Sequence, residues 1–212
     1  IPVQDPYAAY KNSVHGQEIA KGNLKAAVCS DCHGSHTIQA GREMTSKTTK
    51  HSIPATCGRC HEKILKDYRE SIHGDAVAKG IPDAPSCVDC HGEHKVAAVT
   101  SVQAPTSKAH VPDTCSVCHA RPEIMRKYGV PEDRIRTFIE SFHGIAIGLG
   151  GTAEASCVDC HGVHDIRPAA DPESKVFPAN LAKTCGQASC HPAMTEKITG
   201  TKIHRDYSKA GS

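Results

Sequence analysis

The chain has 212 residues, of which 38% are hydrophobic and 4% aromatic, with no Trp and three Phe. A chain of this length normally folds around a packed apolar core, so this composition requires that something other than large apolar side chains supplies much of the interior. The formal charge of +2, with Lys and Arg scattered, argues against a nucleic-acid partner, and no apolar run approaches the roughly 18 residues that span a bilayer.

Helices are predicted ahead of three Ser-x-His-Gly sequences. Asp5-Pro6 resembles a helix cap followed by proline at the first helical position, and apolar residues recur at helical spacing in 64–72 and 131–142. We expect each helix to end at the His-Gly pair, with the glycine in the left-handed conformation that helix ends favour. The region 195–204 is expected to repeat this pattern without the glycine. The charged segment 121–136 is expected to form a surface helix or a contact for a partner.

All twelve cysteines lie in six Cys-Cys-His clusters. Five have the spacing C-x-x-C-H, and the sixth has four residues between its cysteines. The clusters are Cys29-Cys32-His33, Cys57-Cys60-His61, Cys87-Cys90-His91, Cys115-Cys118-His119, Cys157-Cys160-His161 and Cys185-Cys190-His191. C-x-x-C-H is the attachment signature of c-type haem, in which two thiols bond to the porphyrin edge and the adjacent histidine binds the iron. A disulfide scaffold or a set of zinc knuckles does not require a histidine directly after the second cysteine. The sequence therefore predicts six covalently attached haem c groups, with the six cluster histidines as proximal iron ligands.

A two-haem unit is repeated three times, over residues 1–61, 62–120 and 121–212. The first cysteines of each pair of clusters are 28 residues apart in all three units (29 to 57, 87 to 115 and 157 to 185). A Ser-x-His-Gly precedes each pair, and the first cluster of each pair continues as His-Gly-x-His. We expect one continuous domain that is mostly coil with short α-helices and minimal β structure, in which the haems form most of the core.

Nine histidines remain outside the clusters, and six of them hold equivalent places in the three units. These six are predicted as distal iron ligands: His15, His73 and His143 from Ser-x-His-Gly, and His36, His94 and His164 from His-Gly-x-His. Members of the second set must bind a neighbouring haem, because three residues cannot span the macrocycle from the proximal histidine. The first set has two possible registers. A forward register, onto the haems that follow, leaves His204 spare, and a backward register uses His204 and leaves His15 spare.

The remaining candidates are weaker. His51 and His110 lie shortly before second-cluster cysteines, but the third unit has no histidine at that place. Met44, Met125 and Met194 do not repeat, so ligation by two histidines is expected at every iron, which implies comparatively low reduction potentials.

These motifs resemble those of the multihaem c-type cytochromes of anaerobic respiration. Units of that family carry Ser-x-His-Gly, then CxxCH-Gly-x-His, then Pro-x-Thr-Cys-x-x-Cys-His, which here is Pro54-Ala55-Thr56-Cys57 and Pro112-Asp113-Thr114-Cys115. The third unit departs from the pattern, with Lys183-Thr184-Cys185 before the widened cluster. The resemblance covers almost the whole chain. It implies electron transport, in the periplasm or outside the cell, by a carrier, a subunit of a quinone-linked membrane complex, or a filament in which a terminal histidine ligates a haem of the adjacent subunit.

We therefore expect an electron conduit rather than an enzyme, with a multihaem reductase as the less favoured alternative. No C-x-x-C-K occurs, and the spare histidines are numerous enough to close every iron. The favoured form is a protomer of an extracellular filament, with His15 or His204 ligating a haem of the adjacent copy, and the alternative is a monomeric periplasmic carrier. The expected partners are other redox proteins or further copies of the chain. Haem attachment takes place outside the cytoplasmic membrane, so Ile1 is expected to follow a removed export signal.

Overall fold

A computed structural model of the chain describes residues 4–198 and 202–206. These residues form short helices joined by turns and irregular segments, and they contain no β-strand. The longest helix, α8, has nine residues. This confirms the expectation of a mostly coil chain with short helices. None of the described helices is long and apolar enough to cross a lipid bilayer.

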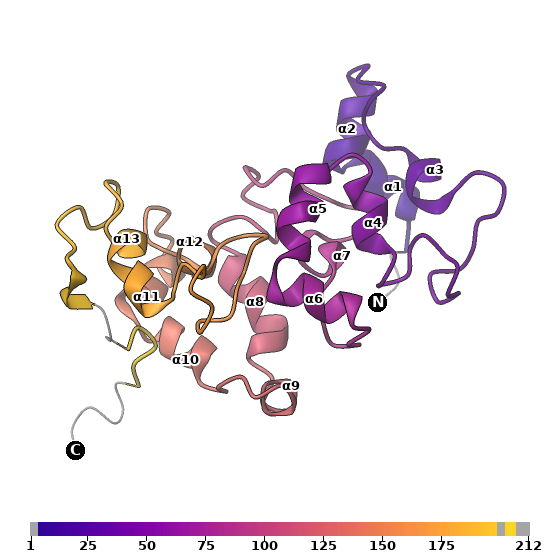
Figure 1. Cartoon of the computed structure of the whole chain (residues 1–212). Helices are drawn as coiled ribbons and strands as arrows, with labels where there is room; N and C mark the ends of the chain where they lie inside the picture. Colours follow the sequence, from indigo (N-terminus) through magenta and orange to yellow (C-terminus); the bar gives the residue numbers. More distant parts are fainter. Residues whose placement is uncertain (1–3, 199–201, 207–212) are drawn as a thin grey trace. The chain divides into compact units, whose positions relative to one another are not determined.

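The chain divides into two compact units, residues 1–107 and 108–212, so the boundary falls inside the second sequence repeat, between its two cysteine clusters. The first unit contains α1 (Pro6–Lys11), α2 (Val14–Ala20), α3 (Cys29–His33), α4 (Ile53–Gly58), α5 (Glu62–Arg69), α6 (Ile72–Ala78) and α7 (Cys87–His91) (Figure 1). The second contains α8 (Val111–His119), α9 (Pro122–Lys127), α10 (Arg134–Ile139), α11 (Phe142–Gly148), α12 (Cys157–His161), the 3-10 turn η1 (Pro178–Asn180), α13 (Leu181–Cys185) and the 3-10 turn η2 (Glu196–Ile198).

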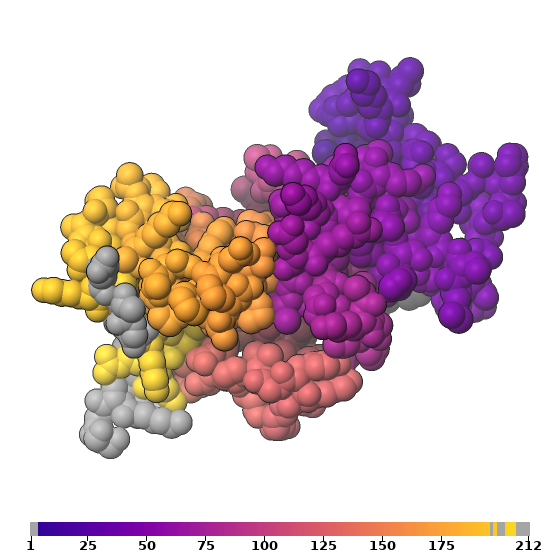
Figure 2. Space-filling view, in the orientation of Figure 1, coloured from indigo at the N-terminus to yellow at the C-terminus, as the bar shows by residue number. Residues whose placement is uncertain are grey.

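The apolar core of the described residues is small. Its buried hydrophobic side chains are Val77, Ala84, Ala104, Val111, Met125, Ile147 and Leu181. The largest fully buried side chains are four serines and a threonine. In the space-filling view the N-terminal segment appears as several lobes with hollows between them (Figure 2). Apolar side chains alone do not give a chain of this size a stable core, as the composition indicates.

Each Ser-x-His-Gly lies at a corner between two helices, not at the end of one. In the first unit α1 ends at Lys11, and Ser13 caps the start of α2, so that His15 lies in the first turn of the second helix. The Ser13 hydroxyl donates to the carbonyl of Tyr10 at 2.6 Å and accepts from the amide of Gly16 at 3.1 Å. The corners between α5 and α6 and between α10 and α11 have the same two bonds. The prediction that each helix ends at His-Gly was therefore wrong, although the helices that precede the motif were predicted correctly.

The motif glycine is needed for close packing and not for a left-handed backbone. The φ angle of Gly16 is not positive, nor is that of its equivalents Gly74 and Gly144. A Cβ atom on any of the three would collide with the carbonyl oxygen of the residue six positions earlier, in the last turn of the preceding helix. Each corner does have a glycine with positive φ, but it lies at the end of the second helix: Gly22, Gly80 and Gly150.

Two further expectations concern the second unit. The segment 121–136 contains α9 and the start of α10, but Met125 of α9 is 4% exposed, so this segment contributes to the core as well as to the surface. The region 195–204 begins with η2, and residues 199–201 lie outside the described part of the chain, so the helix expected there is not observed among the described residues.

Candidate functional site

The first cysteine cluster of each repeat forms a helix of its own. The helices α3, α7 and α12 each begin at the first cysteine and end at the histidine, where a glycine with positive φ stops them. Residues three apart lie on the same face of a helix, so the two thiols can reach the same edge of a planar group. In α7 and α12 a serine and an aspartate cap the first turn: Asp89 accepts from the amide of Ser86 at 2.7 Å and from its hydroxyl at 2.9 Å. These local bonds hold each cluster in a defined conformation.

The second cysteine cluster of each repeat is placed differently relative to its helix. Cys57 lies in α4, whereas Cys60 and His61 come after it, and the whole second cluster of the second repeat lies in α8. In the third repeat α13 ends at Cys185, and Cys190 lies five residues further on, outside the helix. The widened spacing therefore places Cys190 outside the helix that holds Cys185.

Thiols of consecutive clusters lie close together. All twelve cysteines are free of disulfides. The interaction between the Cys57 and Cys87 thiols is the largest cause of a raised pKa at Cys87 and of a lowered pKa at Cys57, so the two thiols lie near each other. Cys115 and Cys157 form the equivalent pair, with the pKa of Cys115 raised.

Two further proximities join clusters of the same repeat. Burial is the largest cause of the raised pKa of Cys32, and the charge of the Cys57 thiolate is the next largest. Burial raises the pKa of Cys160 to about 11, and Cys185 adds to it. The thiol contacts thus follow chain order, from the first cluster to the third in the first unit and from the fourth to the sixth in the second.

Several histidine rings lie beside another histidine ring, and four such pairs each join one cluster histidine to one predicted distal ligand. The centroid separations are 6.3 Å for His15–His61, 5.9 Å for His33–His94, 6.1 Å for His143–His191 and 6.2 Å for His161–His204. Ordinary aromatic contacts span about 4.5–7 Å, so the distance alone does not identify a metal site. Aromatic packing alone does not explain why each pair joins one proximal ligand candidate to one distal ligand candidate.

The separations also fit a haem iron. A first-row metal holds an imidazole nitrogen at about 2.0 Å, and the ring centroid lies about 1.1 Å behind that nitrogen, so two imidazoles on opposite faces of one iron have centroids about 6.2 Å apart. Rotation about the iron–nitrogen axis leaves the angle between the rings free, and the observed angles run from 7° to 51°. The chain thus presents these pairs at the spacing that the predicted cofactor needs.

Burial keeps several of these rings neutral, which is the form that binds a metal. Burial is the main cause of a lowered pKa at His15, His143, His161 and His204, and the nearby cluster histidine adds to it at His15 and His143. Burial also lowers the pKa of His119. The Nδ1 atom of His94 is buried and has no hydrogen-bond partner. This nitrogen lies 3.7 Å from a carboxylate oxygen of Glu93.

The pairs select among the alternatives that the sequence left open. His15 and His143 lie beside cluster histidines of the following pair of clusters, which is the forward register. His94 lies beside the first-cluster histidine of the preceding repeat, and His204 lies beside His161. His73 and His164 hold the equivalent positions, at the start of α6 and after α12, and both are half-buried.

His36 is the exception. Its side chain is exposed, and within residues 4–198 and 202–206 it has no ring partner, hydrogen bond or ion pair. The sequence had suggested His15 or His204 as the spare histidine, whereas the structure places both of these in ring pairs. The signal that sequence reasoning missed is the direction of His94, which lies beside a cluster histidine of the preceding repeat.

His51 and His110 are in no ring pair within the described residues. His51 Nδ1 lies 3.4 Å from the carbonyl oxygen of Val77 in α6, and His110 Nδ1 lies 3.6 Å from a carboxylate oxygen of Asp113. Met44 is 95% exposed. None of these three therefore takes up the position of an axial ligand opposite a cluster histidine.

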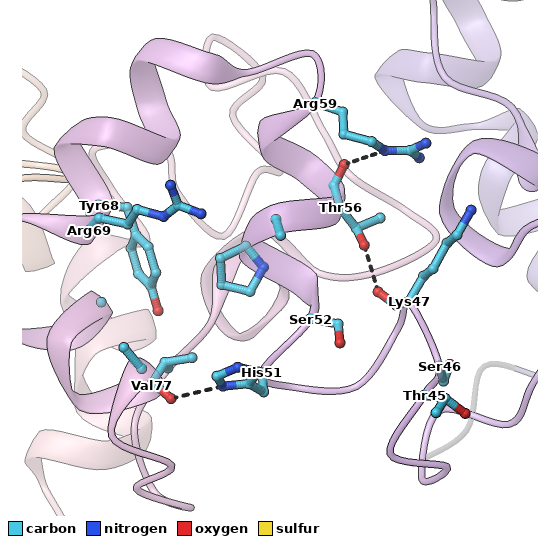
Figure 3. Close-up of a pocket in the computed structure, with 14 residues that line it drawn as sticks. Thr45, Ser46, Lys47, His51, Ser52, Thr56, Arg59, Tyr68, Arg69 and Val77 are labelled. Carbon is cyan, nitrogen blue, oxygen red and sulfur yellow. Dashed lines mark hydrogen bonds between the residues drawn. The ribbon is translucent and has the colours of Figure 1, made fainter.

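A pocket of about 660 Å³ lies beside α4 and α6 in the first unit (Figure 3). Its volume is within the range of cofactor sites. Lys47, Arg59 and Arg69 line it together with His51, which points at Val77. The three cations are suited to bind carboxylates such as haem propionates.

No group of three or more metal-binding side chains occurs among the residues that the structure describes. That finding does not bear on a haem iron, which takes only two side-chain ligands. Comparisons of the chain with known protein families, with curated proteins and with solved structures found no match.

Proposed function

We propose that this protein transfers electrons through six covalently attached haem c groups, each held by two cysteines and two histidines. The observation that carries the proposal is the set of four histidine pairs, each of one cluster histidine and one distal candidate, at centroid separations of 5.9–6.3 Å. His73 and His164, which are equivalent by sequence to members of these pairs, are proposed as distal ligands of the two remaining haems, those of His91 and His119. A haem supplies an iron that accepts and releases one electron.

The side chains of the chain have separate roles in this proposal. The cysteines fix each haem edge to the backbone through thioether bonds, and after that reaction the thiols no longer titrate. Two histidines would bind each iron, which would leave no iron position for a substrate. The cations Lys47, Arg59 and Arg69, which line the pocket in the first unit, would pair with haem propionates.

The order of the thiol contacts supports a conduit. The thiols of Cys57 and Cys87 influence each other's pKa, and so do those of Cys115 and Cys157, although the members of each pair belong to consecutive clusters. Because each thiol is a point of attachment at a porphyrin edge, the edges of consecutive haems come close together. Electrons would therefore pass from haem to haem in chain order within each unit.

The alternative is a multihaem reductase, and spectroscopy of the purified ferric holoprotein separates the two functions. The conduit requires six low-spin haems and no rapid binding of cyanide, nitrite or sulfite. A high-spin haem that binds one of these anions would support the enzyme and contradict the conduit. We further propose an extracytoplasmic location, with other redox proteins or copies of the chain as partners, and electron microscopy of the purified protein distinguishes filaments from isolated particles.

A further inference from the structure

His204 is held differently from two of the other histidines that lie in ring pairs. His15 and His143 lie in the first turns of α2 and α11, whose starts are capped by serine. His204 lies instead in the irregular segment 202–206, in neither a Ser-x-His-Gly nor a His-Gly-x-His sequence. Its ring centroid is nevertheless 6.2 Å from that of His161, with 34° between the ring planes. Contacts outside its own segment must therefore hold the ring in place.

Helix α10 supplies such contacts at two points of the segment, which passes beside it in the second unit (Figure 1). The Oγ1 atom of Thr137 lies 3.1 Å from Nδ1 of His204. The guanidinium of Arg136, the preceding residue, donates to both carboxylate oxygens of Asp206, at 2.9 and 3.4 Å. The side chain of Asp206 is only 14% exposed. The segment is thus bound to α10 at His204 and again two residues beyond it.

Thr137 is an unfavourable residue for its place in α10. It is 0% exposed, although a β-branched residue inside a helix is less favourable than alanine, and a hydroxyl that bonds back to helix carbonyls bends the helix. Counted back from the serine of Ser-x-His-Gly, the same position is Ala9 in the first repeat and Asp67 in the second, and neither is buried. A buried hydroxyl at this position is therefore particular to the third repeat, where it faces His204.

The other hydrogen bonds of Thr137 decide which group donates to which. Its Oγ1 atom lies 2.7 Å from the carbonyl oxygen of Asp133 and 3.2 Å from that of Arg134, and a carbonyl oxygen only accepts. The single hydroxyl proton is therefore directed at the helix backbone. The lone pairs of Oγ1 are left to accept, so the proton shared with His204 belongs to the imidazole and lies on Nδ1.

A proton on Nδ1 has a consequence for the other nitrogen of the ring. In a neutral imidazole only one nitrogen carries a proton, so the lone pair of His204 is on Nε2. Metal-bound histidines commonly donate their second ring N–H to a fixed acceptor, which sets the tautomer and the ring orientation and makes the ligand more basic. The buried Oγ1 of Thr137 is an acceptor of this kind.

We propose that Thr137 is a positioning residue for His204: its hydroxyl oxygen accepts the Nδ1 proton, so that Nε2 binds the haem iron opposite His161. The ion pair of Arg136 with Asp206 anchors the same segment without touching the ring. The inference rests on the proposed haem-binding function and deepens it, because it names the residue that selects the ligand nitrogen at one haem.

The test is the rate at which cyanide binds to the ferric holoprotein, since cyanide reaches this iron only when His204 leaves it. The variant His204→Ala identifies the haem concerned, because it should convert one haem of six to a high-spin form that binds cyanide rapidly. Thr137→Val keeps the branched shape of the side chain and removes the hydroxyl. It should raise the cyanide-binding rate at that haem by about 10-fold or more, because loss of such a hydrogen bond weakens metal ligation by about 10- to 100-fold.

Thr137→Ser is the matched variant, because it keeps the hydroxyl and removes the methyl group. It should bind cyanide at close to the wild-type rate, whereas a purely packing role of Thr137 would make the serine variant react at least as fast as the valine variant. The inference would be overturned by a wild-type rate in Thr137→Val, or by equal increases in Thr137→Val and Thr137→Ser. Six low-spin haems in His204→Ala would overturn it as well.

A measurement on the wild-type protein covers the case in which Thr137→Val loses a haem. Nuclear magnetic resonance of the ferrous, diamagnetic holoprotein, isotope-labelled at histidine nitrogen, detects the Nδ1 proton of His204, which is identified by its absence in His204→Ala. This proton should exchange slowly with water, because it is bonded to a buried oxygen, and exchange as fast as that of an exposed histidine would refute the assignment. Failure of the proposed function is a separate result, since it would appear as a wild-type protein without bound haem.

Discussion

If His15 and His61 bind one haem iron, as proposed, the substitution Gly16→Ala is expected to detach His15 from that iron. The added Cβ would lie 2.9 Å from the Cα atom of Lys11 and would collide with the carbonyl oxygen of Tyr10. Non-bonded carbon atoms are best separated by about 3.5–4.0 Å, so α2 must move away from α1 by about 0.6–1.1 Å. The backbone of α1 lies opposite the new methyl group, so a side-chain rotation cannot relieve the contact.

A displacement of that size is large beside an iron–nitrogen bond of about 2.0 Å. The ring centroids of His15 and His61 are 6.3 Å apart, already as far apart as the separation of about 6.2 Å that one shared iron requires. A further displacement would therefore lengthen an iron–nitrogen bond. We expect one haem of six to become high-spin in the ferric protein, and overpacking of this kind destabilises a fold by about 1–3 kcal/mol. Visible absorption and electron paramagnetic resonance of the ferric protein measure the spin state directly.

Gly148→Ala is the matched control. Gly148 is also in a helix, its φ is not positive, and a Cβ built on it meets nothing within 4 Å. This variant should keep six low-spin haems and be unchanged or slightly more stable, because alanine favours a helix over glycine by up to about 1 kcal/mol. If Gly16→Ala is as fully low-spin as Gly148→Ala, the close approach of α1 and α2 does not position His15, and the reasoning is refuted.

Three further outcomes are expected. Ser71→Ala should lower the free energy of unfolding by about 2 kcal/mol in chemical denaturation, because the hydroxyl caps α6 and is 2% exposed, whereas Ser35→Ala should change it little; equal effects would contradict the capping role. Replacing Cys185 and Cys190 together by serine should remove one haem from the intact mass, and an unchanged mass would exclude the widened cluster as an attachment site. His51→Ala and His110→Ala should each retain six low-spin haems, and a high-spin signal in either would make that histidine an axial ligand after all.

The parts of the candidate site that depend on spacing along the chain could be found from the sequence. The cysteine clusters and the recurring histidines needed only residue positions, and haem attachment and iron ligation at these residues stay predictions. The helices before each Ser-x-His-Gly were also predictable, since Asp5 caps α1 as its position before Pro6 suggests.

The parts that depend on packing between repeats were not predictable in the same way. The role of Gly16 was misjudged because a left-handed φ and a close backbone approach both favour glycine, and only the approach of Tyr10 distinguishes them. The ring partner of His94 was not predicted for a related reason. Whether His94 reaches forward or backward depends on how the segment around Val96 lies against α2, and sequence spacing does not contain that contact.

The intact mass of the denatured, purified protein tests the central claim most directly. Thioether bonds survive denaturation, whereas haem bound only through iron is lost, so the measurement counts covalent attachments and nothing else. The account predicts the mass of the 212-residue polypeptide plus six haems. A mass equal to the polypeptide alone, or to the polypeptide with its thiols oxidised to disulfides, would contradict it.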